Sequence, residues 1–168
     1  MTMKIKITPC STKPFVKVEG QFYRTIDVQY LDQVLDGSIA PGRYSSSSQK
    51  TLYMSASEQG VAAAMIAHSD GTTSARSLVK LDIVAENIFD LRDADACKAV
   101  GINSTDAAQP WQDVVARNEV PRPLLIANKL RDNGANGLID PSRKAPGLWH
   151  LVLFNWNQDA WPIVTVSI

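Results

Sequence analysis

The stretch "PLLIANKLRDNGANGLIDPSRKAPGLWHLVLFNW", residues 123–156, contains a helix, two strands and the turn between the strands. Apolar residues at helical spacing lead up to Gly134, and a glycine just past the last turn is a common helix end. The strand "GLID" (137–140) follows, then a Pro-Ser pair, then the strand "LWHLVLFNW" (148–156). Strands mixed with helices, without a regular βαβ alternation, favour an α+β domain.

The flanking sequence extends this pattern in both directions. Alternation of apolar and polar residues predicts strands at 4–8, 15–26 (around a turn at Gly20), 50–56, 77–84, 87–91 and 163–168. Helices are expected at 30–38, closed by Gly37, at 58–68 behind the N-cap Ser57, and as one or two short helices near Cys97 and Trp111 within 92–123. We therefore predict one compact α+β domain over residues 1–168, with a mixed, largely antiparallel sheet and flanking helices.

The composition narrows the function classes. The chain has 168 residues, 17 Lys and Arg against 17 Asp and Glu, and a formal net charge of zero. A neutral chain gains little from counterion release, so direct nucleic-acid binding is not expected. With no signal peptide and no long apolar span, we expect a cytoplasmic protein that does not enter a membrane.

Cysteine and histidine are sparse. Cys10 and Cys97 are too few and too far apart for a disulfide framework or a thiolate metal site. His68 and His150 are isolated in the sequence, which is more typical of packed or surface residues than of zinc ligands. No metal is expected, and neither histidine is predicted to be catalytic.

Four polar residues at strand ends and in loops are the candidates for a binding site: Arg24, Arg43, Tyr53 and Ser142. Each has a structural interpretation, as a surface arginine, a core tyrosine or a turn serine. Together they could bind a dinucleotide, because a guanidinium binds diphosphate in a bidentate manner and a tyrosine ring can stack on a base. The chain has neither GxGxxG nor GxxxxGK[ST], so a Rossmann or P-loop site is excluded.

Several segments, in order along the chain, resemble the RES domain family. They are "FYRT", "GRYSSSSQKTLYMSAS", the helix ending in "AH", "FDL", and "IANKLRDNGANGLIDPSRKAPGLWHLVLFN". The segment that contains Pro-Ser and the following "LVLFN" strand are the most specific. Where the family has Gly-Arg-Trp-Asn, this chain has Gly42, Arg43, Tyr44 and Ser45, so the arginine is kept and the two residues after it differ.

The resemblance implies a fold and a function. RES domains are toxins of bacterial toxin–antitoxin pairs, with a fold like that of ADP-ribosyltransferase toxins, NAD as substrate and an Xre-like antitoxin as partner. It also implies that Arg43, Tyr53 and Ser142 are catalytic, and that Arg24, Arg43, Tyr53 and Ser142 bind NAD. ADP-ribose would pass to water, phosphate or a protein acceptor. We expect the antitoxin to plug the cleft, and the apolar segment "LVLFNW" (151–156) suggests a protein partner.

Position 64 departs from the family. The resemblance places a glutamate eleven residues after Tyr53, where this chain has Ala64. Cleavage of the nicotinamide–ribose bond passes through an oxocarbenium-like sugar, which a carboxylate stabilises, so Ala64 predicts impaired catalysis. Three explanations remain open: an engineered inactivation, a natural variant in which Glu58 or Glu86 takes over, or a lineage that has lost catalysis.

Two rival functions remain beside the enzyme. A non-catalytic module could keep the pocket, or only the antitoxin-binding surface, after loss of the glutamate. A generic α+β adaptor would use all the named polar residues structurally. NAD turnover distinguishes the enzyme from the module, whereas NAD affinity does not.

Overall fold

The computed structural model describes residues 4–38, 40–66, 75–159 and 162–167. The strands are β1 (Lys6–Pro9), β2 (Val16–Asp27), β3 (Leu52–Ser55), β4 (Arg76–Asp90), β5 (Gly137–Pro141), β6 (Trp149–Leu153) and β7 (Ile163–Val166). The helices are the 3₁₀ helix η1 (Val28–Gln33), α1 (Glu58–Ile66), α2 (Ala94–Val100), α3 (Ser104–Ala107), α4 (Gln112–Ala116) and α5 (Arg122–Asp132). The prediction of an α+β fold with a mixed sheet and flanking helices is confirmed.

The sheet closes on itself. Its seven strands follow the order β1-β2-β3-β6-β5-β4-β7, and an additional pairing joins β2 to β4. Five strands, β2, β3, β6, β5 and β4, therefore form a ring, with β1 and β7 added outside it. Of these pairs only β4 and β5 are parallel. The ring is weakest between β2 and β3, which pair at one register position, Tyr23 with Ser55.

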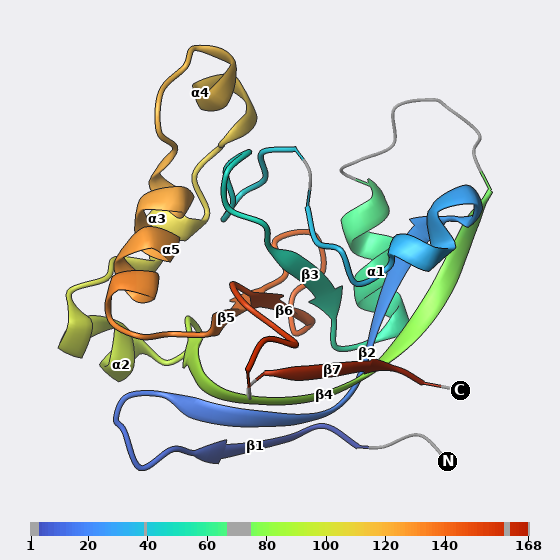
Figure 1. The fold of residues 1–168 in the computed structure, drawn as a ribbon. Helices are drawn as coiled ribbons and strands as arrows, with labels where there is room; N and C mark the ends of the chain where they lie inside the picture. The colour runs from blue at the N-terminus through green and yellow to red at the C-terminus, as the bar shows by residue number, and fades with distance from the viewer. Residues whose placement is uncertain (1–3, 39, 67–74, 160–161, 168) are drawn as a thin grey trace.

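Two cores form on the two faces of this ring. The inner core joins residues from all five ring strands, among them Phe22, Leu52, Leu81, Ile139 and Leu153, each fully buried. The outer core lies between the ring and helices α2, α3 and α5, which gather on one side of the sheet (Figure 1). Side chains of a strand alternate between faces, and β3, β4, β5 and β6 contribute to both cores, whereas β2 contributes only to the inner core.

Two strand predictions were wrong in detail. β2 runs through Gly20 without a turn, and that residue adopts a φ of +149°. A Cβ at Gly20 would lie 2.6 Å from the Cα of Ile5, so the glycine permits close approach of β1. The two strands expected at 77–84 and 87–91 are one strand, β4, which continues past Asn87 at a φ of 56°.

The helical predictions also need correction. The helix expected at 30–38 is the shorter η1. Residues 92–123 contain three short helices, α2, α3 and α4, where one or two were expected. The helix expected at 58–68 is α1, described to Ile66, and His68 lies outside the described residues. Within the described part of the chain, no helix has the length and apolarity needed to cross a membrane.

The apolar segment at 151–156 does not offer a partner surface. Leu151, Val152 and Leu153 belong to β6, which lies between β3 and β5, and all three are at most 1% exposed. Their apolar side chains pack into the inner and outer cores. The expectation of a protein partner therefore cannot rest on this strand.

The close approach of β5 and β6 at Gly137 leads to a stability prediction. An added Cβ at Gly137 would collide with the Val152 carbonyl oxygen and lie 3.1 Å from the Cα of Leu153. Gly137→Ala should lower the free energy of unfolding by about 3 kcal/mol, measured by urea denaturation. The control is Gly134→Ala, where φ is +87° but no atom lies within 4 Å, and about 1 kcal/mol is expected. Equal losses would contradict this account.

Candidate functional site

The loop that carries Arg43 is fastened to Tyr53. The Tyr53 hydroxyl accepts a hydrogen bond from the Tyr44 backbone N–H at 3.0 Å and lies 2.9 Å from the Ser45 Oγ. A Cβ at Gly42 would lie 2.8 Å from the same hydroxyl, so glycine is needed where the loop crosses the tyrosine. The sequence-predicted pair Arg43 and Tyr53 is thus brought together by the backbone between them.

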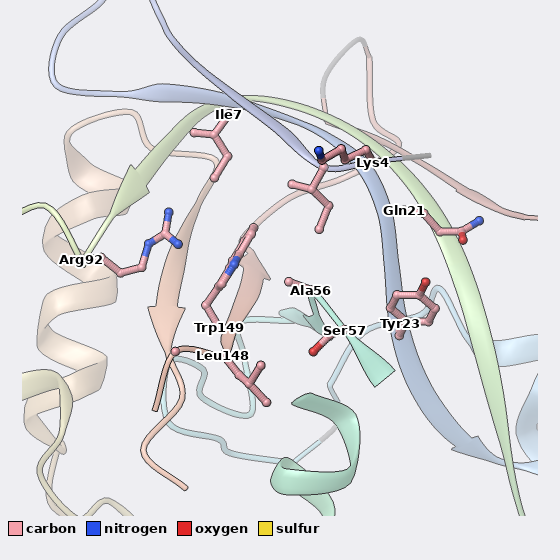
Figure 2. Close-up of a pocket in the computed structure, with 11 residues that line it drawn as sticks. Lys4, Ile7, Gln21, Tyr23, Ala56, Ser57, Arg92, Leu148 and Trp149 are labelled. Carbon is pink, nitrogen blue, oxygen red and sulfur yellow. The ribbon is translucent and has the colours of Figure 1, made fainter. Parts of the chain in front are cut away.

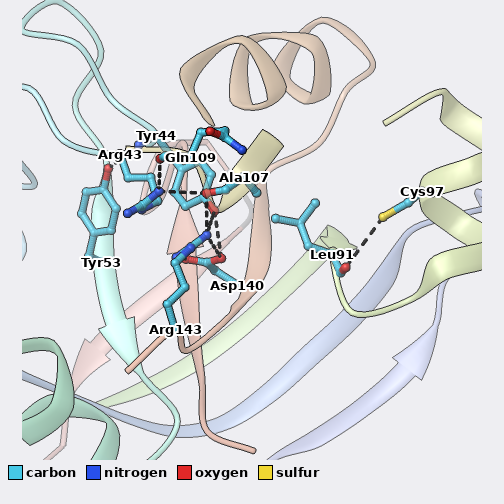
Figure 3. A network of polar contacts seen from close by, with 9 residues as sticks. All are labelled: Arg43, Tyr44, Tyr53, Leu91, Cys97, Ala107, Gln109, Asp140 and Arg143. Atoms are coloured by element: carbon cyan, nitrogen blue, oxygen red, sulfur yellow. Dashed lines mark hydrogen bonds and ion pairs between the residues drawn. The ribbon is translucent and has the colours of Figure 1, made fainter. Parts of the chain in front are cut away.

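A buried carboxylate lies behind this loop. Asp140, 5% exposed at the end of β5, accepts from the Tyr44 hydroxyl at 2.8 Å. Arg143 donates to both oxygens of Asp140, at 2.9 and 3.1 Å, and also to the Tyr44 hydroxyl at 3.0 Å. Arg143 and Arg43 both donate to the carbonyl of Ala107, which ties the network to α3 (Figure 3).

The charges in this network do not balance. Two guanidinium groups, those of Arg43 and Arg143, lie near one carboxylate, and of the two only Arg143 hydrogen-bonds to it among the described contacts. Burial, followed by the charge of Arg143, lowers the pKa of Arg43. Nη1 of Arg43 donates to the Ala107 and Gln109 carbonyls, at 2.9 and 2.7 Å, while Nε and Nη2 have no acceptor among the described residues. The loop therefore presents an excess positive charge that suits an anion.

The tyrosines of the site are protonated. Burial raises the pKa of Tyr53, and burial together with the Asp140 charge raises that of Tyr44. Tyr53 is also packed against the outer core, so its ring is only partly accessible. Both hydroxyls act as fixed hydrogen-bonding groups at neutral pH.

A row of polar side chains crosses three strands beside the network. Ser55 on β3 is the register partner of His150 on β6, and His150 is the register partner of Asp140 on β5. The Ser55 Oγ lies 2.8 Å from Nδ1 of His150. The sequence alone excluded His150 because no nearby residue in the chain could pair with it.

Ser142 and Ala64 lie apart from these contacts. The Ser142 Oγ accepts from the backbone N–H of Ala145 at 3.2 Å, and the backbone N–H of Ser142 donates to the Leu148 carbonyl. The serine therefore stabilises the loop before β6. Ala64 is half-buried on α1, a helix that packs on β2 and β3. No described contact joins either residue to Arg43.

Arg24 has an unusual environment. It lies on β2 opposite Val79, on the same strand face as Phe22. Its Nε and Nη1 are buried and, within the described residues, have no hydrogen-bond partner. Burial and the nearby Arg76 lower its pKa. A buried donor without an acceptor is costly, so Arg24 has unused capacity for an anionic group. No described contact links it to Tyr53.

The two substitute carboxylates considered for position 64 are exposed. Glu58 lies in the first turn of α1 and Glu86 near the middle of β4, where its backbone carbonyl accepts from Asn136. Neither side chain has a described contact with Arg43 or Tyr53.

The larger of two described clefts lies elsewhere. It has a volume of about 510 Å³ and opens beside the weak β2–β3 junction, between Ile5, Tyr23, Ala56, Arg92 and Trp149 (Figure 2). The Arg92 guanidinium lies over the Trp149 ring at 4.8 Å and pairs with Asp90. None of the sequence-predicted site residues lines either cleft.

Sequence reasoning also missed Tyr44, Asp140 and Arg143. Asp140 and Arg143 flank the Pro-Ser pair at a spacing of three, a pattern that alone is typical of a turn. Their partnership with Tyr44 spans 96 and 99 residues. Only the folded structure reveals it.

Comparisons with known proteins agree with this architecture. The profile of the RES domain matches residues 21–167. A chain of the crystal structure of the M. tuberculosis MbcT-MbcA toxin-antitoxin complex superimposes with a TM-score of 0.65 and 17% sequence identity, covering 89% of this chain and 82% of that chain. At this identity the likeness establishes the fold. Among curated proteins there is no match.

The environment of His150 gives a pH prediction. Burial first, and then the charge of Arg143, lower the pKa of His150 from 6.5, although Asp140 opposes this. Below about pH 6.5 the unfolded chain therefore binds more protons at this residue than the folded chain. The free energy of unfolding should fall between about pH 7 and about pH 5, and less steeply in His150→Gln. Urea denaturation at both pH values tests this, and identical slopes for both proteins would contradict it.

Proposed function

Because the chain belongs to the RES domain family, we propose that it is a toxin of a toxin–antitoxin pair that binds NAD and cleaves its nicotinamide–ribose bond. The fold is that of RES proteins, which is similar to ADP-ribosyltransferases. The neighbouring structure is a toxin–antitoxin complex, which supports an antitoxin as partner. By family resemblance this partner is Xre-like. A cytoplasmic setting is proposed from the sequence, which has no signal-peptide pattern.

One observation carries the assignment of the site: the Tyr53 hydroxyl holds the Arg43 loop in place. This contact keeps the Arg43 guanidinium, whose Nε and Nη2 have no acceptor among the described residues, near a partly accessible tyrosine ring. A guanidinium can bind a diphosphate in a bidentate manner, and an aromatic base or the nicotinamide ring can stack on the tyrosine ring. The excess charge of Arg43 and Arg143 over Asp140 favours the same ligand.

Arg24 and Ser142 are the remaining family positions. Arg24 offers buried donors without an acceptor, which suits a second anionic group of NAD. Ser142 shapes the loop before β6 and offers a half-buried hydroxyl. ADP-ribose passes to water, phosphate or a protein side chain.

The alternative function is a module that has kept the pocket without the chemistry. Ala64 supplies no carboxylate, and the two glutamates that could substitute for it are exposed. Such a module would bind NAD or the antitoxin and release no nicotinamide. Turnover separates the two functions.

The test is to install the family's carboxylate. Ala64→Glu should raise nicotinamide release from NAD by about a hundredfold while NAD affinity changes little, because this group acts mainly on the transition state. Ala62→Glu, at an exposed position of the same helix, is the matched control. In cells only the Ala64→Glu variant should become markedly toxic without antitoxin.

Two outcomes would contradict the role of position 64. Equal and substantial turnover by the unaltered chain and by Ala64→Glu would show that other residues suffice. NAD binding without turnover by either protein would favour the binding module.

A further inference from the structure

The polar row across β3, β6 and β5 is arranged as in enzymes that activate a nucleophile. Ser55, His150 and Asp140 occupy directly opposed register positions on three adjacent strands. Register partners in a sheet point to the same face, so the three side chains lie next to one another. The same face carries Tyr53, two residues before Ser55 on β3.

The serine and histidine are in direct contact. The Ser55 Oγ lies 2.8 Å from His150 Nδ1, within the range expected for a catalytic hydroxyl–imidazole pair. Ser55 is 4% exposed, whereas His150 stays partly exposed. Nε2 of His150 has no hydrogen-bond partner within the described part of the chain. The imidazole is therefore held at one nitrogen and available at the other.

This pair lies between the two parts of the proposed site. A Cβ added at Gly60 would lie 3.1 Å from the Ser55 Cβ, so Ser55 packs under the first turns of α1, the helix that carries Ala64. On the other side, the charges of Asp140 and Arg143 act on His150. Arg143 also donates to the Tyr44 hydroxyl and to the Ala107 carbonyl, which accepts from Arg43 as well.

The imidazole is neutral at physiological pH. Burial has the largest effect and lowers the pKa of His150; the Asp140 charge comes next and raises it, the Arg143 charge lowers it, and the net shift is downward. A neutral imidazole can accept a proton, which the imidazolium cannot.

Resting on the function proposed above, we propose that His150 is the general base of this chain, positioned by Ser55 and Asp140, and that it activates a water molecule to attack NAD. This assigns water as the acceptor of ADP-ribose. It also assigns a catalytic role to a residue other than the one at position 64, where the family has its glutamate.

The reaction balances as a hydrolysis. The water oxygen forms a bond to C1′ of the nicotinamide ribose, and the bond between C1′ and the pyridinium nitrogen breaks. The bonding electrons stay on that nitrogen, which converts the cationic ring to neutral nicotinamide. In the tautomer whose Nδ1–H donates to the Ser55 Oγ, Nε2 of His150 takes the water proton and later releases it to solvent. The products are ADP-ribose, nicotinamide and one proton.

The role of His150 is compatible with Ala64. A general base contributes about 10²- to 10⁴-fold, and an electrostatic group at the sugar contributes separately. The unaltered chain should therefore turn over NAD slowly but measurably. Ser55 acts as a positioning residue through its contact with Nδ1 of His150, and Asp140 acts on the imidazole through its charge.

The first experiment follows the His150 imidazole by NMR during titration of the full chain with NAD. Only two histidines are present, so His150→Gln assigns the signal. NAD should shift the His150 signal with the same dissociation constant that calorimetry gives for the whole protein. NAD binding that leaves the signal unchanged would overturn the role of His150 and leave the proposed function standing. Absence of NAD binding would overturn the proposed function itself.

The second experiment measures nicotinamide release. His150→Gln should lower kcat by about a hundredfold with the NAD dissociation constant nearly unchanged. Ser55→Ala should lower kcat less and shift the pH profile of kcat, because it frees Nδ1. Ser11→Ala, at an exposed serine in the turn between β1 and β2, is the matched control and should change neither. Full activity of His150→Gln, or no turnover by an unaltered chain that binds NAD, would overturn the proposal.

Discussion

The buried carboxylate of Asp140 is the constraint on which the site depends. It lies at the end of β5 with 5% of its surface exposed, and it is satisfied by the Tyr44 hydroxyl and by Arg143. Removal of one partner from a buried charge costs several kcal/mol of stability, so Asp140, Tyr44 and Arg143 depend on one another. Through Tyr44 this requirement fixes the Arg43 loop, and through Ala107 it fixes α3. One charge thus joins three parts of the chain that are distant in sequence.

The fold around this carboxylate could largely be predicted from local patterns. The helix ending at Gly134, the strand before Pro-Ser and the strand at 148–156 all follow from periodicity and end signals, and β5, β6 and α5 occupy these places. The wrong predictions lie where contacts between residues distant in sequence determine the structure. Gly20 indicates a turn in the sequence, but the structure uses it for close approach of Ile5. The apolar run at 151–153 suggests a surface for a partner, but closure of the ring buries it on both faces.

The site was predictable only in part, for the same reason. Arg43 and Tyr53 are ten residues apart, and their proximity comes from one loop folding over one hydroxyl. His150 meets Ser55 and Asp140 only because of strand register, which a sequence without its pairing partners does not specify. A histidine that is isolated in the sequence therefore did not indicate a catalytic role, whereas the same histidine beside a buried serine in the structure does. Arg24 and Ser142 were candidates from their places at strand ends and in loops, and no described contact joins either of them to Arg43.

We propose that NAD occupies the space around the Arg43 loop and the outer face of β3 and β6. The most direct measurement is a crystal structure of the full chain with NAD. We predict that the diphosphate contacts Nε or Nη2 of Arg43 and that the nicotinamide ribose lies within hydrogen-bonding distance, about 3 Å, of a water on His150 Nε2. NAD bound instead in the cleft between Tyr23 and Trp149, with Arg43 uncontacted, would contradict the account.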